Sequence, residues 1–389
     1  MDGAPPLLFD DADETAVAPP AQPIARLDRL PTPDAWEELA RGAAEPNPFF
    51  ERAFLRPSLR HLGEDGTRLL TVWQGARLVG LLPVGRRRGY ARMPLRLLVN
   101  WAHPNMFLGT PLVLAGREEA FWRAALACLD EVGDSDLIHL SALPAKGPVL
   151  AALLRVASAD ERPADVVHRE ERALFAPTVP GHAYYQAAVR KKKRKEIGRL
   201  GNRLADLGPV ARRVLGADED VAPWAERFLA LEAAGWKGEA GSALASAPDT
   251  RAFFLDMIAA AHARGRLDFV SLDVGGRAVA MLCTILDASG REGFSFKIAY
   301  DEALARLSPG VLLQVANMDL AERRGLAAVD SCAAPDHPMI DSLWAERRSL
   351  VRVTLALGSR RSRLLFRLAR AAERAAAARR ARPTEEPAQ

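Results

Sequence analysis

The chain has 389 residues, of which 49% are hydrophobic and 26% are charged. This composition supplies the cores of two ordinary domains, so wholesale disorder is excluded. The sequence has no run of about 18 apolar residues, and its acidic, proline-rich start lacks the basic region of a secretory signal. We therefore expect a cytoplasmic protein without a membrane-spanning helix.

The net charge of +4 is unevenly distributed. Residues 190–203 carry +7 and residues 355–389 carry +6, which leaves −9 for the rest of the chain. The basicity belongs to two segments and does not indicate attraction of the whole protein to nucleic acid. The cysteines Cys128, Cys283 and Cys332 are far apart and form no paired motif, which favours free thiols. No metal-binding template is present, so we predict no metal site.

The first half of the chain reads as mixed α/β structure. A turn and helix are expected within Pro46 to Leu62, and a tight turn at Gln74-Gly75 predicts a β-hairpin. In chain order, the expected elements are strands at 68–73, 77–84, 95–101 and 111–114, a helix at 118–132, a strand at 136–140 and a helix near 147–156.

The second half repeats this order. A long basic helix is expected from Tyr184 to Asp206, and Gly275-Gly276 predicts a second tight hairpin. The other expected elements are a strand at 211–215, helices at 221–234 and 249–264, strands at 267–274, 278–286 and 293–299, a helix from about 310 to 323 and a strand at 327–332. Two similar α/β units in tandem are the predicted organisation.

The domain boundaries follow from these patterns. We predict a disordered acidic tail at 1–24, an N-terminal domain at 25–178, a C-terminal domain at 179–357 and a basic Arg/Ala-rich helical tail at 358–389. Weak apolar content favours a flexible arrangement for this last segment, although its basic residues also make it a candidate for peripheral membrane contact.

The first candidate site is the helix start at Ser308-Pro309-Gly310. Ser at the N-cap and Pro at the first helical position open a helix whose next residue has no side chain. Gly310, Val311 and Leu312 are then expected to present backbone N–H donors at the positive end of the helix dipole. The pattern suits a pyrophosphate, although a simple helix cap explains it as well.

A second candidate is Gly235-Trp236-Lys237-Gly238, where a helix ends and an aromatic ring and a cation follow. These side chains are placed either to line a pocket or to fill a partly buried cap. A third candidate follows the strand at 327–332, where Asp330, Cys332 and His337 lie near one strand end. His337 can exchange a proton near neutral pH, whereas a cysteine nucleophile at Cys332 is disfavoured because it sits in a strand pattern.

Taken together, the motifs resemble a known family. The segments are Trp236-Lys237-Gly238, residues 296–301, Leu307-Ser308-Pro309-Gly310, Asp330-Ser331-Cys332 and residues 337–344. Their order and spacing resemble the acetyltransferases associated with cellulose biosynthesis, within the GNAT superfamily, over roughly residues 35 to 355. The resemblance implies tandem GNAT-like folds, as in the Fem peptidyltransferases, with acyl-CoA bound by the second. The usual GNAT pyrophosphate loop is replaced here by residues 306–310.

The resemblance implies direct transfer of an acyl group from acetyl-CoA or another acyl-CoA to an amine, with both substrates bound together. The residues that it implies for the donor diphosphate are Ser308, Gly310 and Val311. Asp330 or His337 is the implied base and Tyr300 the implied acid, while Trp236, Lys237, Lys297 and Asp301 would line the substrate pocket. The implied acceptor is a sugar amine or another small amine, with a link to polysaccharide biosynthesis.

Two other functions remain open at this point. One is a Fem-like aminoacyl transferase that uses aminoacyl-tRNA, the only nucleic acid expected as a partner. The other is a binding protein that keeps the fold without catalysis. The cations at 190–203 are compatible with a solvated helix face, CoA phosphates, tRNA or an anionic membrane. The oligomeric state is left open.

Overall fold

The computed structural model describes residues 21–27 and 29–380, and confirms the mixed α/β class. Within these residues the strands form one sheet of 13 strands. Its order is β1-β2-β3-β4-β6-β13-β7-β12-β11-β10-β9-β8, and β5 pairs with β3 off this path. The strands are β1 (Pro23–Leu27), β2 (Arg68–Gln74), β3 (Arg77–Tyr90), β4 (Met93–Asn100), β5 (Leu112–Val113), β6 (Leu137–Pro144), β7 (Ala164–Phe175), β8 (Val210–Val214), β9 (Leu267–Val274), β10 (Arg277–Leu286), β11 (Glu292–Tyr300), β12 (Ala328–Asp330) and β13 (Glu346–Ala356).

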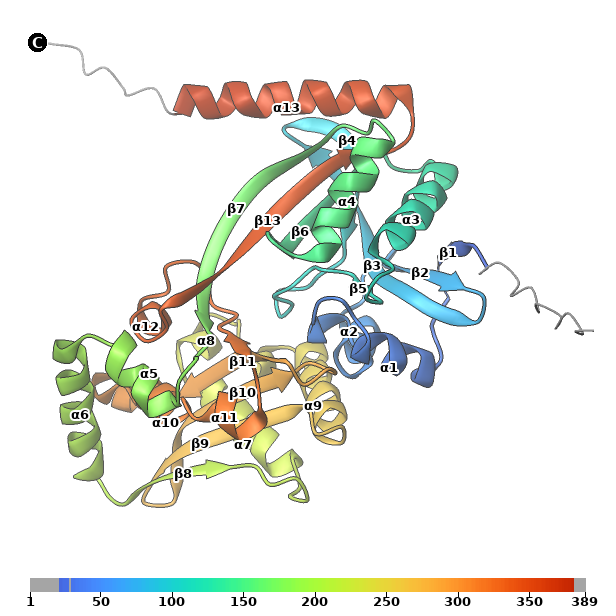
Figure 1. Ribbon diagram of the computed structural model, residues 1–389. Coiled ribbons are helices and arrows are strands. Elements are labelled where there is room, and N and C mark those ends of the chain that lie inside the picture. Colours follow the sequence, from blue (N-terminus) through green and yellow to red (C-terminus); the bar gives the residue numbers. More distant parts are fainter. Residues whose placement is uncertain (1–20, 28, 381–389) are drawn as a thin grey trace, which may run out of the picture.

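Helices cover both faces of this sheet (Figure 1). The α-helices are α1 (Pro33–Arg41), α2 (Arg52–Leu62), α3 (Glu118–Val132), α4 (Pro148–Ala159), α5 (Gly181–Ala188), α6 (Lys191–Ala205), α7 (Ala222–Ala233), α8 (Trp236–Glu239), α9 (Pro248–His262), α10 (Pro309–Ala316), α11 (Leu320–Arg324), α12 (Pro338–Asp341) and α13 (Arg360–Arg380). Short 3₁₀ turns are η1 (Pro48–Phe50), η2 (Leu244–Ser246) and η3 (Glu302–Leu307).

The two halves of the chain repeat one motif. In the first, β2, β3 and β4 are antiparallel, and β6 pairs parallel with β4 after α3. In the second, β9, β10 and β11 are antiparallel, and β12 pairs parallel with β11 after α10. Both glycines of the predicted Gly275-Gly276 hairpin have positive φ, as a two-residue turn of this kind requires. The repeated order predicted from the sequence is therefore observed.

The final strands of the two halves are exchanged. β7 ends the first half yet pairs with β12 of the second, while β13 ends the second half and pairs with β6 of the first. β7 and β13 also pair with each other along most of their length, and in Figure 1 these two long strands connect the two parts of the molecule. The sheet is thereby continuous through both halves.

Aromatic side chains join the halves on one face of the sheet. Phe49 and Phe54, near the start of the chain, lie edge-to-face with Phe294 and Phe296 of β11, at centroid distances of 5.6 and 5.7 Å. This face carries α2, α7 and α9, and its buried residues form one core that extends through both halves. The opposite face of β9–β11 packs against α6 and α10 in a separate core.

Two predicted helices are shorter than expected. The helix predicted from Tyr184 to Asp206 is divided into α5 and α6, because Val189 and Arg190 have extended backbone angles. The Arg194 guanidinium then donates to the carbonyls of Gln186 and Val189 at the end of α5. The helix predicted to reach residue 323 ends at Ala316, and α11 follows as a separate turn. Strands β1, β7 and β13 and helix α1 were missed by the sequence reading.

The two terminal tails predicted from the sequence also differ from the structure. Residues 1–20 lie outside the described residues, but Pro23–Leu27 pairs with β2, so the predicted N-terminal tail extends too far. The flexible arrangement favoured for the C-terminal segment is wrong for 360–380, which form α13. This helix is held by Phe366 and Ala369, which pack on Leu95, Leu97, Leu137 and Ala356. Residues 381–389 lie outside the described part.

Candidate active site

The start of α10 follows directly from the end of β11. β11 ends at Tyr300, η3 turns the chain, and Ser308 adopts a left-handed conformation with φ of 50° before Pro309 begins the helix. Contrary to the sequence prediction, the Ser308 side chain does not cap the helix. Among the described residues, the N–H groups of Gly310 and Val311 have no hydrogen-bond acceptor. The third expected donor, the Leu312 N–H, instead donates to Ser308 O at 3.1 Å. The two amides are thus unpaired donors at a helix N-terminus.

Gly310 itself is buried among three neighbouring side chains. A Cβ at this position would lie 3.5 Å from Ile298 and Tyr300 and 3.8 Å from Met339, which are ordinary contact distances. The turn is therefore closely packed at the Gly310 Cα, with room for a methyl group and little more. Met339 also brings the loop that contains His337 against the start of α10.

The corresponding helix of the first half is unsuited to anions. α3 opens with Glu118 and Glu119, whose carboxylates oppose a negative ligand at the helix N-terminus. The gap beyond its parallel strand pair is also filled: the buried Asn100 side chain hydrogen-bonds to Ser141 N and O and to Gly109 O at distances of 2.9 to 3.1 Å. By contrast, the first turn of α10 contains no acid. Carboxylates would therefore oppose an anionic ligand at the start of α3 but not at the start of α10.

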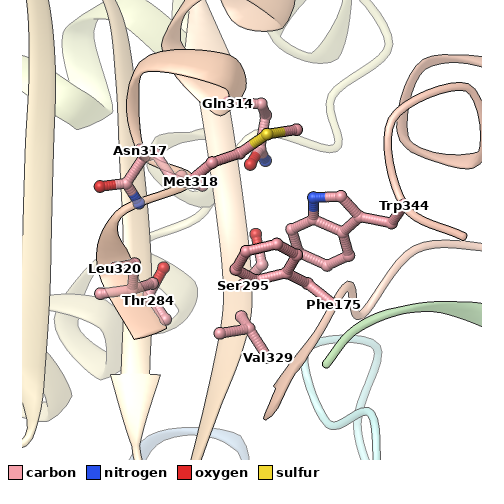
Figure 2. A pocket seen from close by; sticks show the side chains of 10 residues that line it. Phe175, Thr284, Ser295, Gln314, Asn317, Met318, Leu320, Val329 and Trp344 are labelled. Carbon is pink, nitrogen blue, oxygen red and sulfur yellow. The ribbon is translucent and has the colours of Figure 1, made fainter. Parts of the chain in front are cut away.

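A small cavity with both apolar and polar lining side chains lies where β11 and β12 diverge. Their parallel pairing stops at Phe294 and Asp330, and beyond it Ser295 faces a cavity of about 10 Å³, enough for about one water molecule. Thr284 Oγ1 and Trp344 Nε1 are buried beside it without a hydrogen-bond partner among the described residues. Figure 2 shows these side chains with Gln314 and Asn317 of the α10 region around the same space.

A buried carboxylate with two lysines lies on the other face of the second half. Glu232, in the last turn of α7, has a side chain only 1% exposed, and its Oε1 lies 3.3 Å from Lys237 Nζ and 3.6 Å from Lys297 Nζ. Its Oε2 accepts the Leu244 N–H at 2.8 Å. Burial lowers the pKa of Lys297 below its ordinary value, and Glu232 partly offsets this effect. A carboxylate near a helix C-terminus opposes the helix dipole, and here the two lysines offset that repulsion.

A bulge in β11 sets the direction of Lys297. Cys283 of β10 pairs with Lys297, whereas Thr284 pairs with Ser295, so Phe296 is the extra residue. As a result, Phe296 and Lys297 both face α7 and α9, while Ser295 faces the small cavity on the opposite side.

An open groove of about 450 Å³ borders this cluster. The end of α7, the start of β10 and the segment after β11 form its walls, with Arg227, Arg277, Asp301 and Glu302 as the charged lining residues. Trp236 is 55% exposed at the same end of α7, and its backbone N–H donates to Glu302 Oε1 at 2.7 Å. Leu231 and Glu302 line both this groove and the small pocket beside Glu232 and Lys237.

The structure brings together the predicted pocket residues. Lys237 and Lys297 meet at Glu232, Trp236 lines the small pocket beside Glu232 and Lys237, and Asp301 lines the adjoining groove. The sequence reading missed Glu232 and Glu302. The signal for Glu232 was its position five residues before Lys237, among apolar residues at the end of the helix.

Asp330 is poorly placed to act as a base. Its fully buried carboxylate contacts the guanidinium groups of Arg172 at 2.7 Å and Arg348 at 3.0 Å. Burial raises its pKa, but the two arginines and the Cys332 N–H outweigh this and hold the pKa below the ordinary range. The neighbouring Cys332 has its pKa raised by burial and by Asp330, which opposes thiolate formation.

The other two predicted proton-transfer residues are nearer to α10. The Tyr300 ring contacts the Gly310 position and also lines the space beside Lys237. The Nδ1 atom of His337 is buried and lacks a hydrogen-bond partner among the described residues. His337 also directly precedes α12, which carries Met339 to the start of α10.

Helix α6 adds positive charge beside this helix start. Ile197, Leu200 and Leu204 bury one side of α6, which packs against η3 and α10. A row of exposed cations at every fourth position follows another side of the helix: Lys191, Lys195, Arg199 and Arg203. With a rise of about 1.5 Å per residue, this row is about 18 Å long.

Part of this site lies within a domain that a family model matches. Residues 191–337 match the family model described as an acetyltransferase (GNAT) domain. The GNAT match begins with α6 and ends at His337, so it includes Glu232, Lys297 and the start of α10. Curated proteins show no significant match to the chain.

Solved structures share the fold over both halves. FemX has a TM-score of 0.56 at 9% identity, covering 84% of this chain and 96% of its own. A conserved protein of unknown function from Bacteroides thetaiotaomicron has a TM-score of 0.53 at 11% identity, covering 86% and 100%. The C-terminal domain of a protein named as a lysylphosphatidylglycerol synthetase from Agrobacterium fabrum has a TM-score of 0.50 at 12% identity, covering 86% and 95%. The chain therefore has a tandem GNAT-type fold.

Proposed function

We propose that this protein is an N-acyltransferase that moves an acyl group from acyl-CoA to an amine while both substrates are bound. The observation that carries the proposal is the start of α10, where Ser308 Oγ and the N–H groups of Gly310 and Val311 are uncommitted at a helix N-terminus. These donors suit the diphosphate of CoA, and the cations of α6 increase the attraction. The equivalent helix of the first half, with its two carboxylates, lacks this property.

The acceptor amine is assigned to the groove at the end of α7. Glu302 gives part of its wall negative charge, which attracts an ammonium group, while Asp301 in the same wall is paired with Arg277 at 2.7 Å. Trp236, which lines the small pocket next to the groove, offers an exposed ring for a sugar or another small acceptor. The amine loses a proton before or during its attack on the thioester, and the departing thiolate gains one. We assign this proton transfer to His337 and Tyr300 and exclude Asp330, whose carboxylate is committed to two arginines.

The test is thermal unfolding of the full chain with acetyl-CoA, longer acyl-CoAs and CoA. A ligand that binds the native state raises the melting temperature by mass action. We expect stabilisation by acyl-CoA and, as a product, by CoA. No shift with any of these compounds at millimolar concentration would remove the donor assignment and leave a fold retained for another role.

A second candidate is aminoacyl transfer from aminoacyl-tRNA. The cation row on α6 supports it, because a row of about 18 Å exceeds what one diphosphate needs and can follow several phosphates of a nucleic acid. Ionic strength distinguishes the two donors. Binding of tRNA would weaken steeply as salt increases, with a reduced slope after Lys195→Ala and Arg199→Ala, whereas acyl-CoA binding would change much less.

A further inference from the structure

Helix α13 lies across one end of the molecule, with one side on the protein and the other side outward (Figure 1). Phe366 and Ala369 are buried on the inner side, and Arg370 forms an ion pair with Asp165 at 2.8 Å. Tyr90, from the β3–β4 hairpin, donates from its hydroxyl to Glu373 at 3.1 Å. These contacts fix the rotation of the helix, so its outward side is a defined surface.

The outward side has an apolar centre. Leu364 and Leu368 are 57% and 49% exposed, and the exposed Ala371 and Ala375 continue the same stripe at spacings of three and four residues. Two large exposed leucines at i and i+4 are an unusual feature for a surface helix in water. No inner contact requires them, because Phe366 and Ala369 already hold the helix.

Arginines lie on both sides of this apolar stripe. Arg360 and Arg367 are exposed on one side and Arg361 on the other, and residues 360–380 contain eight arginines against one glutamate. Two more exposed arginines, Arg88 and Arg92, belong to the hairpin whose Tyr90 contacts the helix. An apolar centre with basic flanks is the pattern of a helix that lies in the interface of an anionic bilayer.

We propose that the outward side of α13 binds an anionic membrane surface, with Leu364 and Leu368 entering the headgroup region and the arginines contacting lipid phosphates. A second copy of α13 is a poorer occupant, because the arginines on both flanks would then face like charges. The attachment is peripheral: among the described residues, none of the helices has the length and apolar content needed to cross a bilayer. In Figure 1, α13 lies at the end of the molecule away from α6 and α10.

The test is flotation of the full chain with vesicles of phosphatidylcholine alone and of phosphatidylcholine with phosphatidylglycerol in a three-to-one ratio. We expect binding to the anionic vesicles only. Leu364→Ser with Leu368→Ser should weaken it at least tenfold, and Arg360→Ala, Arg361→Ala and Arg367→Ala together should weaken it about 100-fold, or roughly fivefold per arginine. All five positions face outward, so an unchanged melting temperature verifies the fold of each variant.

Two controls address other sources of binding. Leu30→Ser removes a leucine that is 62% exposed elsewhere, and should leave flotation unchanged. Lys191→Ala, Lys195→Ala and Arg199→Ala remove the same amount of charge from α6, and should reduce flotation much less than the α13 arginine variant. The proposal is overturned if the wild-type chain does not float with anionic vesicles, if the α13 variants float equally well, or if only the α6 variant loses binding. A concentration-dependent dimer that the leucine variant dissolves would also overturn it, in favour of a second copy.

Discussion

Glu232 of α7 and Lys297 of β11 form a buried ion pair, with 3.6 Å between Oε1 and Nζ. The pair joins the helix that borders the proposed acceptor groove to strand β11 of the second half. Because Lys237 contacts the same carboxylate, one negative charge serves two lysines. Removal of this charge therefore has a predictable effect on both stability and pH dependence.

The first prediction concerns Glu232→Gln. The variant keeps the shape of the side chain but leaves two partly buried ammonium groups without their counter-ion, so the free energy of unfolding should fall by about 2 kcal/mol, less than for a fully buried pair. Urea unfolding measures this change. Glu226→Gln, on the exposed part of the same helix, is the matched control and should change stability little. Equal effects of the two substitutions would contradict the buried pairing.

Glu232→Gln should also increase the pH dependence of stability. The pKa of Lys297 is lowered in the folded protein, so the unfolded chain binds more protons and stability rises with pH toward the ordinary value of 10.5. Without Glu232 the pKa falls further, and this rise should begin at lower pH. Melting temperatures of both proteins across the alkaline range give the comparison, and parallel curves would refute the coupling.

The second prediction concerns the helix start at Gly310. A methyl group fits beside Ile298, Tyr300 and Met339, so Gly310→Ala should fold normally, whereas Gly310→Val should crowd the approach to the amides and reduce acyl-CoA affinity at least tenfold. Calorimetric titration measures this affinity. Gly198→Ala on α6, where a Cβ meets nothing within 4 Å, is the control for a glycine in a helix. Unchanged affinity in folded Gly310→Val would remove α10 from the donor site.

The third prediction tests whether Asp330 stabilises the fold or acts in catalysis. Asp330→Asn leaves Arg172 and Arg348 buried without their shared anion, and should reduce the free energy of unfolding by about 3–5 kcal/mol. At a temperature low enough for Asp330→Asn to stay folded, its turnover should be close to that of the wild type. Asp319→Asn removes a half-exposed partner of Arg212 and should cost much less stability. A large loss of turnover at full stability would restore Asp330 as a base.

The fourth prediction is a pH effect at Glu45. This buried carboxyl accepts the Val149 N–H at 2.9 Å, and burial raises its pKa to about 7 from an ordinary value of 4.5. The folded protein then holds a proton that the unfolded chain releases, so the stabilisation present below pH 4.5 is lost as pH rises to about 7. The loss amounts to about 3 kcal/mol.

Glu45→Gln should abolish that loss, because the amide oxygen still accepts the Val149 N–H and carries no charge. The melting temperature of the wild type should fall relative to the variant between pH 5 and pH 8. Glu38→Gln is the comparison variant, because Glu38 is an exposed carboxylate that pairs with Arg77. Identical pH profiles for Glu45→Gln and the wild type would show that Glu45 stays ionised.

The sequence predicted most of the repeated motif because its signals are local. Glycine turns at residues 275 and 276 and the apolar periodicity of α3 specify their elements without reference to distant residues. β7 was missed because its apolar residues are interrupted by a charged run from His168 to Arg172, and only its long pairing with β13 makes that run a strand.

The candidate site was predictable in part for the same reason. Gly310 and Lys237 belong to short motifs, whereas the roles of Glu232 and Asp330 depend on partners far along the chain. The arginines that neutralise Asp330 come from β7 and β13, which the sequence reading did not identify as strands. A carboxylate that the sequence presents as a candidate base is therefore a structural anion.

The exchange of β7 and β13 means that the chain cannot be cut into two working modules. If it were severed between the halves near residue 179, each piece would retain a long strand whose partners belong to the other, and would expose unpaired edges at β6 and β12. Such fragments should aggregate when produced alone, yet reassemble when both are produced together. Genetic complementation by split halves is thus the behaviour that this topology favours.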